Sequence, residues 1–147
     1  MIETKIFDAV NVPSEIEKRE IVNFLFENLE KYGDPKEHIQ KAIDYSVKEI
    51  VSFGGFTMAL QENGQILGVV VINQTGMGGY IPENILVYIA TDKNRRGEGL
   101  GKTLMQKAID FARGDIALHV EANNPAKNIY EKLGFTNPYL EMRLKKQ

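Results

Sequence analysis

The residues Arg95-Arg96-Gly97-Glu98-Gly99-Leu100-Gly101-Lys102 lie between two apolar runs of different periodicity, and this order decides the fold. Residues 85–90, which precede them, are rich in β-branched and aromatic side chains and predict a strand. After them, apolar residues recur at the spacing of a helix, at Leu100, Leu104, Met105, Ala108 and Ile109. The sequence therefore predicts a strand, a glycine-rich loop and a helix in succession.

A glycine-rich loop at the start of a helix predicts a site for a phosphate. The first N–H groups of a helix have no partner within the helix, and they lie at the positive end of its dipole. Glycine has no Cβ, so an anion can come close to the backbone at Gly97, Gly99 and Gly101. A phosphorylated ligand is the expected occupant, although a plain glycine turn before a helix fits the same residues.

Spacing separates the known kinds of phosphate loop. Gly101-Lys102-Thr103 supplies the second half of a Walker loop, but Arg96 stands where its first glycine is required. The dinucleotide pattern Gly-x-Gly-x-x-Gly fails too, because Lys102 or Leu104 stands at its last glycine. Arg96-x-x-Gly99-x-Gly101 does fit the pattern Gln/Arg-x-x-Gly-x-Gly/Ala. In this stretch the chain resembles the GNAT superfamily of N-acetyltransferases.

A second motif extends the resemblance. Within residues 121–135 the GNAT family reads Asn-x-x-Ala-x-x-(apolar)-Tyr-Glu-Lys-x-Gly-Phe. The residues of this chain that match it in register are Asn123, Ala126, Ile129, Tyr130, Glu131, Lys132, Gly134 and Phe135. The two motifs also follow each other in the family's order and at its usual separation. Together they are far more specific than either motif alone.

Local signals predict the other elements. A weak strand is expected over residues 3–9, and helices are expected to start after Ser14, with a capping box, and after Asp34 as N-cap. Asn63-Gly64 favours a tight hairpin, and a last strand is expected over residues 139–144. We expect an α/β fold, with a mixed, mostly antiparallel sheet of six to seven strands and about four helices. The order of these elements is that of the GNAT family. We expect residues 1–147 to form one domain.

The resemblance implies acetyl-CoA as the acyl donor, with its pyrophosphate on the N–H groups of residues 96–102. Nearby cationic side chains would add positive charge, whereas Glu98 is unfavourable beside phosphates unless it points to solvent. The pantetheine arm would pair with the edge of the preceding strand, where the next strand splays away. The predicted cofactor-binding residues are Ile89, Ala90, Thr91, Arg95, Arg96, Gly97, Glu98, Gly99, Leu100, Gly101, Lys102 and Asn123.

The chemistry that the resemblance implies is direct attack of an amine on the acetyl thioester, which needs a base and an acid. Tyr130 matches the tyrosine that protonates the CoA sulfur in many relatives. Glu83 is the first candidate for the base, because it lies two residues before Ile85, the position of the catalytic glutamate in some relatives. Glu121 and His119 are weaker candidates. A solvated loop carboxylate or a strand histidine explains these side chains equally well.

The acceptor has no motif. Its pocket is expected within residues 20–55 and 74–84. The chain carries a net charge of −2, so a cationic primary amine of a small molecule or a peptide is the expected acceptor, drawn toward Glu62, Glu83 and Glu121. The same charge argues against nucleic acid as a partner.

Composition sets further expectations. The absence of cysteine excludes disulfides, a cysteine nucleophile and thiolate zinc sites, and no metal is expected. No signal peptide or spanning run is visible, so we expect a cytoplasmic monomer or homodimer that does not bind membranes. The leading hypothesis is an acetyl-CoA-dependent N-acyltransferase. One alternative is a noncatalytic acyl-CoA-binding or sensory module. A nucleotide-binding domain is a weaker alternative.

Overall fold

One sheet forms the centre of the computed structural model, which describes residues 1–147. Its strands lie in the order β1 (Ile2–Phe7), β2 (Gly55–Glu62), β3 (Gln65–Gln74), β4 (Asn84–Thr91) and β5 (Ile116–Leu118). The first four strands pair antiparallel, and β5 pairs parallel to β4. The helices are α1 (Glu15–Leu29), α2 (Lys36–Ser46), α3 (Leu100–Phe111) and α4 (Ala126–Lys132), with short 3-10 turns η1 (Glu30–Tyr32) and η2 (Lys93–Arg95).

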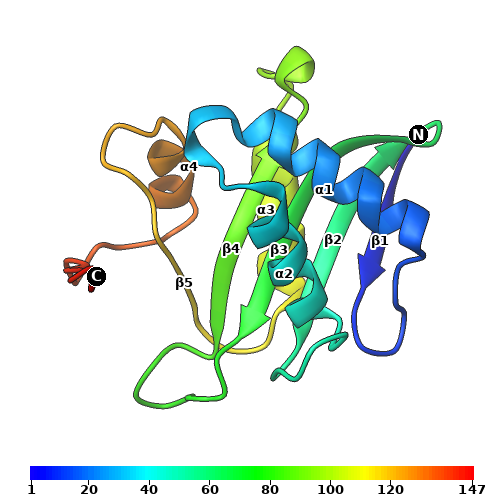
Figure 1. Cartoon of the computed structure of the whole chain (residues 1–147). Helices are drawn as coiled ribbons and strands as arrows, with labels where there is room; N and C mark the ends of the chain where they lie inside the picture. The colour runs from blue at the N-terminus through cyan, green and yellow to red at the C-terminus, as the bar shows by residue number, and fades with distance from the viewer.

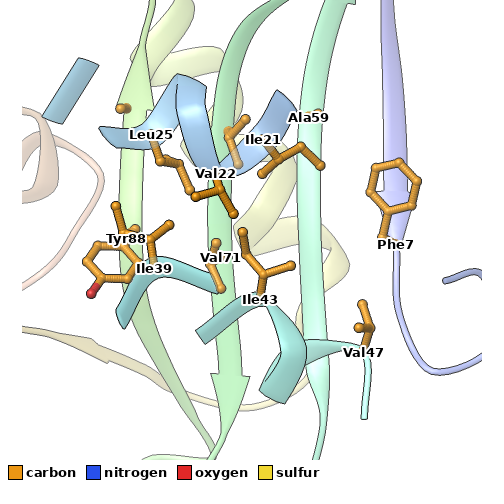
Figure 2. Packing of buried hydrophobic residues seen from close by; sticks show 12 residues of the cluster. Phe7, Ile21, Val22, Leu25, Ile39, Ile43, Val47, Ala59, Val71 and Tyr88 are labelled. Carbon is orange, nitrogen blue, oxygen red and sulfur yellow. The ribbon is translucent and has the colours of Figure 1, made fainter. Parts of the chain in front are cut away.

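The helices cover both faces of the sheet, as Figure 1 shows with α1 and α2 in front and α3 behind. Against α1 and α2 lies one apolar cluster, which includes Leu25, Ile39 and Ile43, all without exposed surface (Figure 2). A second cluster joins the other face to α3 and α4 through Leu104 and Tyr130. Each fully buried aliphatic side chain contributes about 1.5–3 kcal/mol. These two layers hold the loops at the ends of β4 and β5 in place.

Two local predictions are confirmed. Ser14 caps α1, its hydroxyl accepting from the N–H of Glu17 while the Glu17 carboxylate accepts from the N–H of Ser14. Asn63 and Gly64 both take positive φ, at 51° and 78°, in the tight turn between β2 and β3.

A buried ion group ties α1 to the end of α2. The ammonium of Lys18 lies 2.9 Å from Asp44 and 2.8 Å from Glu49, and Lys18 is only 5% exposed. Burial lowers the pKa of Lys18, but the hydrogen bonds to Glu49 and Asp44 outweigh it and raise the pKa to about 12. The ammonium therefore stays charged and fixes the two helices relative to each other.

A bulge in β4 changes which face its side chains occupy. The pairing of β3 with β4 shifts between Val71 and Ile72, so that one residue of β4 is extra. As a result, Leu86 contacts the cluster under α3, whereas Val87 and Tyr88 both contact the cluster under α1 and α2. Without the bulge, strict alternation would return Tyr88 to the face of Leu86.

The expected six to seven strands are wrong, because the sheet has five. The strand predicted over residues 139–144 does not form, and its apolar side chains are at least 85% exposed. Only Thr136-Asn137-Pro138 separate Phe135 from Tyr139, which leaves too little chain for another strand and a turn, and proline has no N–H for a sheet. The C-terminal segment instead runs from α4 outward, away from the sheet (Figure 1). None of the helices is long and apolar enough to cross a membrane.

Candidate functional site

The site lies where β4 and β5 separate. Their pairing covers Asn84 to Leu86 on β4 and stops at the pair Leu86 and Leu118. Beyond that pair, β4 continues to Thr91 with β3 on its other side only. The backbone of β4 from Val87 onward therefore presents an edge without a neighbouring strand. Two adjoining cavities open along this part of β4.

The larger cavity, here the loop cavity, has a volume of about 610 Å³. It lies between the end of β4, the glycine-rich loop, the start of α3, and α4. The predicted cofactor-binding residues that line it are Ile89, Ala90, Thr91, Arg95, Arg96, Gly97, Gly99, Leu100, Gly101 and Lys102. The other two, Glu98 and Asn123, are not among its lining residues.

The backbone of the glycine-rich loop requires glycine at two positions. Gly97 and Gly99 have φ of 92° and 78°, a region that side chains with a Cβ rarely adopt. Gly99 is the N-cap of α3, so the free N–H groups of the first turn follow it directly. A Cβ at either glycine would meet no atom within 4 Å, so the space beside this backbone is open. The loop thus combines free N–H groups with room for an anion.

Ion pairs neutralise part of the charge of this loop. The guanidinium of Arg95 holds the Glu98 carboxylate at 2.8 Å, and this hydrogen bond lowers the pKa of Glu98. Arg96 pairs with Glu30 of η1 at 3.0 Å, which joins the loop to the end of α1. Lys102 and Lys132 line the loop cavity without an ion pair of their own. Glu98 therefore turns toward Arg95, and the two lysines supply the uncompensated positive charge.

The smaller cavity, here the tyrosine cavity, has a volume of about 300 Å³. Its walls come from the end of α1 and its connection to α2, from β4, from the chain after β5, and from α4. The lining residues are Leu29, Tyr32, Asp34, Ile85, Leu86, Val87, Tyr88, Ile89, His119, Val120, Asn124 and Tyr130. It shares Leu29, Tyr32, Ile89, Asn124 and Tyr130 with the loop cavity, so the two cavities meet at these side chains.

Tyr130 stands at this junction. It is 7% exposed, belongs to α4, and its ring centroid lies 5.8 Å from that of Phe135. Burial raises the pKa of Tyr130 to about 12. The phenol therefore keeps its proton at neutral pH and is able to donate it as a hydrogen bond.

Comparison with known proteins accounts for this arrangement. Residues 19–135 match the model of the acetyltransferase (GNAT) family. The chain belongs to this family. GNAT proteins use acetyl-CoA, and the loop cavity fits the phosphates of that molecule in its open glycine backbone, free N–H groups and unpaired lysines.

Solved structures share the GNAT fold at low sequence identity. A possible acetyltransferase from Clostridium difficile 630 is 16% identical with a TM-score of 0.70, covering 100% of this chain and 98% of the other. A ribosomal-protein-alanine N-acetyltransferase from Brucella melitensis biovar Abortus 2308 is 11% identical with a TM-score of 0.67, covering 99% of each chain. An aminoglycoside N-acetyltransferase in complex with CoA is 12% identical with a TM-score of 0.67, covering 100% and 97%. At these identities the likeness establishes the fold.

Glu83, the predicted base, lies outside both cavities of this GNAT domain. One of its carboxylate oxygens accepts a hydrogen bond from the N–H of Asp115 at 2.7 Å. This bond, followed by those from its own N–H and from Gly79, lowers the pKa of Glu83. The carboxylate thus ties the loop before β4 to the turn before β5, at the end of β4 away from Tyr130.

Some of the other predicted site residues line a cavity, and some do not. His119 lines the tyrosine cavity, whereas Glu121 lines neither cavity. The carbonyl of Asn123 accepts a hydrogen bond from the Tyr32 hydroxyl at 3.4 Å, and its neighbour Asn124 lines both cavities. The side chain of Asn124 also accepts a hydrogen bond from the N–H of Ala126, the first residue of α4, at 2.9 Å.

Sequence reasoning did not single out Asp34 or Tyr88 as site residues. Asp34 was expected to cap α2, but that helix begins one residue later than expected, at Lys36, and makes no side-chain cap. The Asp34 carboxylate instead accepts a hydrogen bond from the Tyr88 hydroxyl at 2.5 Å.

Lys132 lines the loop cavity but was not predicted as a cofactor-binding residue. It belongs to the matched Tyr-Glu-Lys motif, and this motif was the signal that would have found it. Of the segments expected around the acceptor, residues 29–34 contribute to the tyrosine cavity and residues 74–84 do not.

Proposed function

We propose that this chain is an N-acetyltransferase that transfers the acetyl group of acetyl-CoA directly to a primary amine, with residues 1–147 acting as one domain. The observation that carries the proposal is the meeting of two cavities at Tyr130, one suited to phosphates and one without lysine or arginine. A direct transfer requires both substrates side by side, and this arrangement provides room for both. The acceptor is a small molecule or an exposed peptide amine.

The loop cavity would hold acetyl-CoA through its backbone and its lysines. The N–H groups at the start of α3 face the pyrophosphate, and Lys102 and Lys132 add charge. The free edge of β4 at Ile89 to Thr91 offers peptide groups to the amides of the pantetheine arm. Acetyl-CoA supplies an activated acyl group on a thiolate leaving group.

The side chains at the junction would manage the protons. The amine nitrogen forms a bond to the acetyl carbon as the carbon–sulfur bond breaks, and Tyr130 donates its hydroxyl proton toward the departing sulfur. The proton that the amine loses goes to the imidazole of His119 or to water, since His119 lines the tyrosine cavity. Glu83 has no part in this scheme, because its carboxylate is held by backbone N–H groups outside the cavities.

Release of CoA thiol tests the proposal. Purified protein is incubated with acetyl-CoA and with primary amines, amino acids and lysine-containing peptides, and thiol is followed across pH 7–10. We expect amine-dependent thiol release together with calorimetric binding of acetyl-CoA. Binding of acetyl-CoA without turnover of any amine would favour the noncatalytic acyl-CoA-binding module, and absence of both would overturn the proposal.

A further inference from the structure

Asp34 gives the tyrosine cavity a single negative charge. It is the only carboxylate among the lining residues, and no lysine or arginine lies among them. The other polar walls are tyrosines, His119 and Asn124. A carboxylate at the wall of a cavity that has no lysine or arginine is the chemistry that binds an organic ammonium group, through a charge-assisted hydrogen bond. The loop cavity has the opposite character, because Lys102 and Lys132 lie on it unpaired.

Tyr88 holds Asp34 in position. Tyr88 is 9% exposed, and its hydroxyl donates to Oδ2 of Asp34 at 2.5 Å. Burial raises the pKa of Tyr88, and the carboxylate of Asp34 raises it further, so the hydroxyl stays a donor. Figure 2 shows the hydroxyl oxygen of Tyr88 at the margin of the apolar cluster that buries its ring. The bond uses one carboxylate oxygen and leaves Oδ1 for a ligand.

Several features that position this pair come from the fold and not from neighbours in sequence. The bulge of β4 places Tyr88 on the face of α1 and α2, within hydrogen-bond distance of Asp34 in the connection between these helices. Because α2 begins at Lys36, the carboxylate of Asp34 is not used as a helix cap. The ion group of Lys18 holds the two helices that flank this connection.

We infer that the acceptor carries at least two amino groups, one of which is bound as an ammonium by Asp34 while the other is acetylated beside Tyr130. This inference rests on the proposed function and names its substrate class. A carboxylate stabilises the protonated form of an amine, so the group held by Asp34 keeps its proton and has no lone pair for attack. The second amino group, at the junction of the cavities, loses its proton and forms the new C–N bond. The bound ammonium is unchanged by the reaction, and the products are a monoacetylated diamine and CoA.

A series of amines tests this assignment in the intact chain. Linear diamines with three to eight carbons are compared with monoamines, amino alcohols and ω-amino acids of the same lengths. We expect kcat/KM to be about tenfold or more higher for the best diamine than for its monoamine, with an optimum length set by the span between Asp34 and Tyr130. The ω-amino acids, which place a second carboxylate beside Asp34, should be the poorest substrates.

Two variants separate recognition from folding. Asp34→Asn keeps the size of the side chain and removes its charge, and it should lower the ratio of kcat/KM for the diamine to kcat/KM for the monoamine about tenfold. Tyr88→Phe keeps the buried ring and removes the hydroxyl; as a positioning residue, it should raise the KM for the diamine with little change in kcat. Glu37→Gln is the control, since Glu37 is an exposed carboxylate of α2 outside both cavities.

A binding measurement keeps this inference separate from the proposed function. Calorimetry of the best diamine with the protein saturated with CoA should give a Kd that is about tenfold weaker in Asp34→Asn and unchanged in Glu37→Gln. Equal kcat/KM for diamines and monoamines, or equal diamine binding by wild type and Asp34→Asn, overturns this inference and leaves the acetyltransferase proposal standing. Turnover of no amine, with diamine binding intact and dependent on Asp34, overturns the acetyltransferase proposal and leaves the cation site standing.

Discussion

The two cavities that meet at Tyr130 are built in different ways. Apart from Lys132, the walls of the loop cavity that would face phosphates come from one continuous segment, residues 95–102, and act mainly through backbone groups. The tyrosine cavity takes its polar walls from side chains of separate elements, with Asp34 before α2, Tyr88 on β4 and Tyr130 on α4. A binding site made of backbone leaves a local pattern in the sequence, whereas a site made of distant side chains does not.

The two cavities also differ in the charge of their lining side chains. The loop cavity has unpaired lysines, and its one lining carboxylate, Glu30, already pairs with Arg96 at 3.0 Å. The tyrosine cavity has Asp34 and no lysine or arginine. Opposite charge on adjoining cavities would keep an anionic donor and a cationic acceptor each on its own side, and this difference supports the proposed placement of the two substrates.

The largest expected effect comes from the residue that both cavities share. Tyr130→Phe keeps the ring in the core but removes the proton donor, so turnover should fall by about 10²–10³-fold. Acetyl-CoA affinity, measured by calorimetry, should change less than twofold. Tyr139→Phe, in the exposed C-terminal segment, serves as the control. Wild-type turnover in a folded Tyr130→Phe variant would remove this hydroxyl from the mechanism.

A smaller effect should fall on the loop cavity alone. The Cβ of a residue at Gly101 would make ordinary contact with Ile129 at 3.7 Å, so side chains are tolerated there without positive φ. Gly101→Glu places a negative charge where the phosphates would lie and should weaken acetyl-CoA binding about tenfold relative to Gly101→Gln. The KM for the amine should be the same in both variants. Equal acetyl-CoA affinity in the two variants would contradict the assignment of phosphates to this loop.

The smallest effect on turnover is expected outside both cavities, at Glu83. Glu83→Gln should leave kcat/KM within twofold of wild type and lower the temperature of unfolding at pH 7, because an amide accepts from fewer backbone N–H groups. In the folded protein the pKa of Glu83 is lowered, so its stabilisation is complete above its unfolded value of about 4.3 and is lost as the pH falls through the lower folded value.

Thermal unfolding between pH 3 and pH 7 measures this difference. The gap between wild type and Glu83→Gln should be widest at pH 7 and close toward pH 3. Glu121→Gln, which changes a carboxylate outside both cavities that lies in no strand or helix, should show no such gap. A large loss of turnover in Glu83→Gln at unchanged stability would instead support Glu83 as the base.

The sequence predicted the parts of the molecule that local patterns determine. The capping box at Ser14, the turn at Asn63-Gly64 and the strand, loop and helix around residues 85–111 all appear in the structure. The family followed from two motifs that lie close to the loop cavity. Ten of the twelve predicted cofactor-binding residues line that cavity, and these ten lie in one continuous stretch of chain, residues 89–102.

The parts that depend on tertiary contacts were missed. No local signal marks the bulge of β4, which is seen only in its pairing with β3 and which turns Tyr88 toward Asp34. Asp34 followed by Pro35 reads as a helix start, but the carboxylate contacts β4 instead. The apolar residues over 139–144 read as a strand, but no strand forms there and these side chains stay exposed.

Direct transfer requires the two cavities to hold both substrates at once. Initial rates of thiol release, measured while acetyl-CoA and an amine acceptor are varied together, test it most directly. Simultaneous occupation with direct transfer predicts double-reciprocal lines that intersect, and no acetylated protein after incubation with acetyl-CoA alone. Parallel lines, together with an acetyl group found on the protein by mass spectrometry, would mean that one site serves the two substrates in turn and would contradict the account.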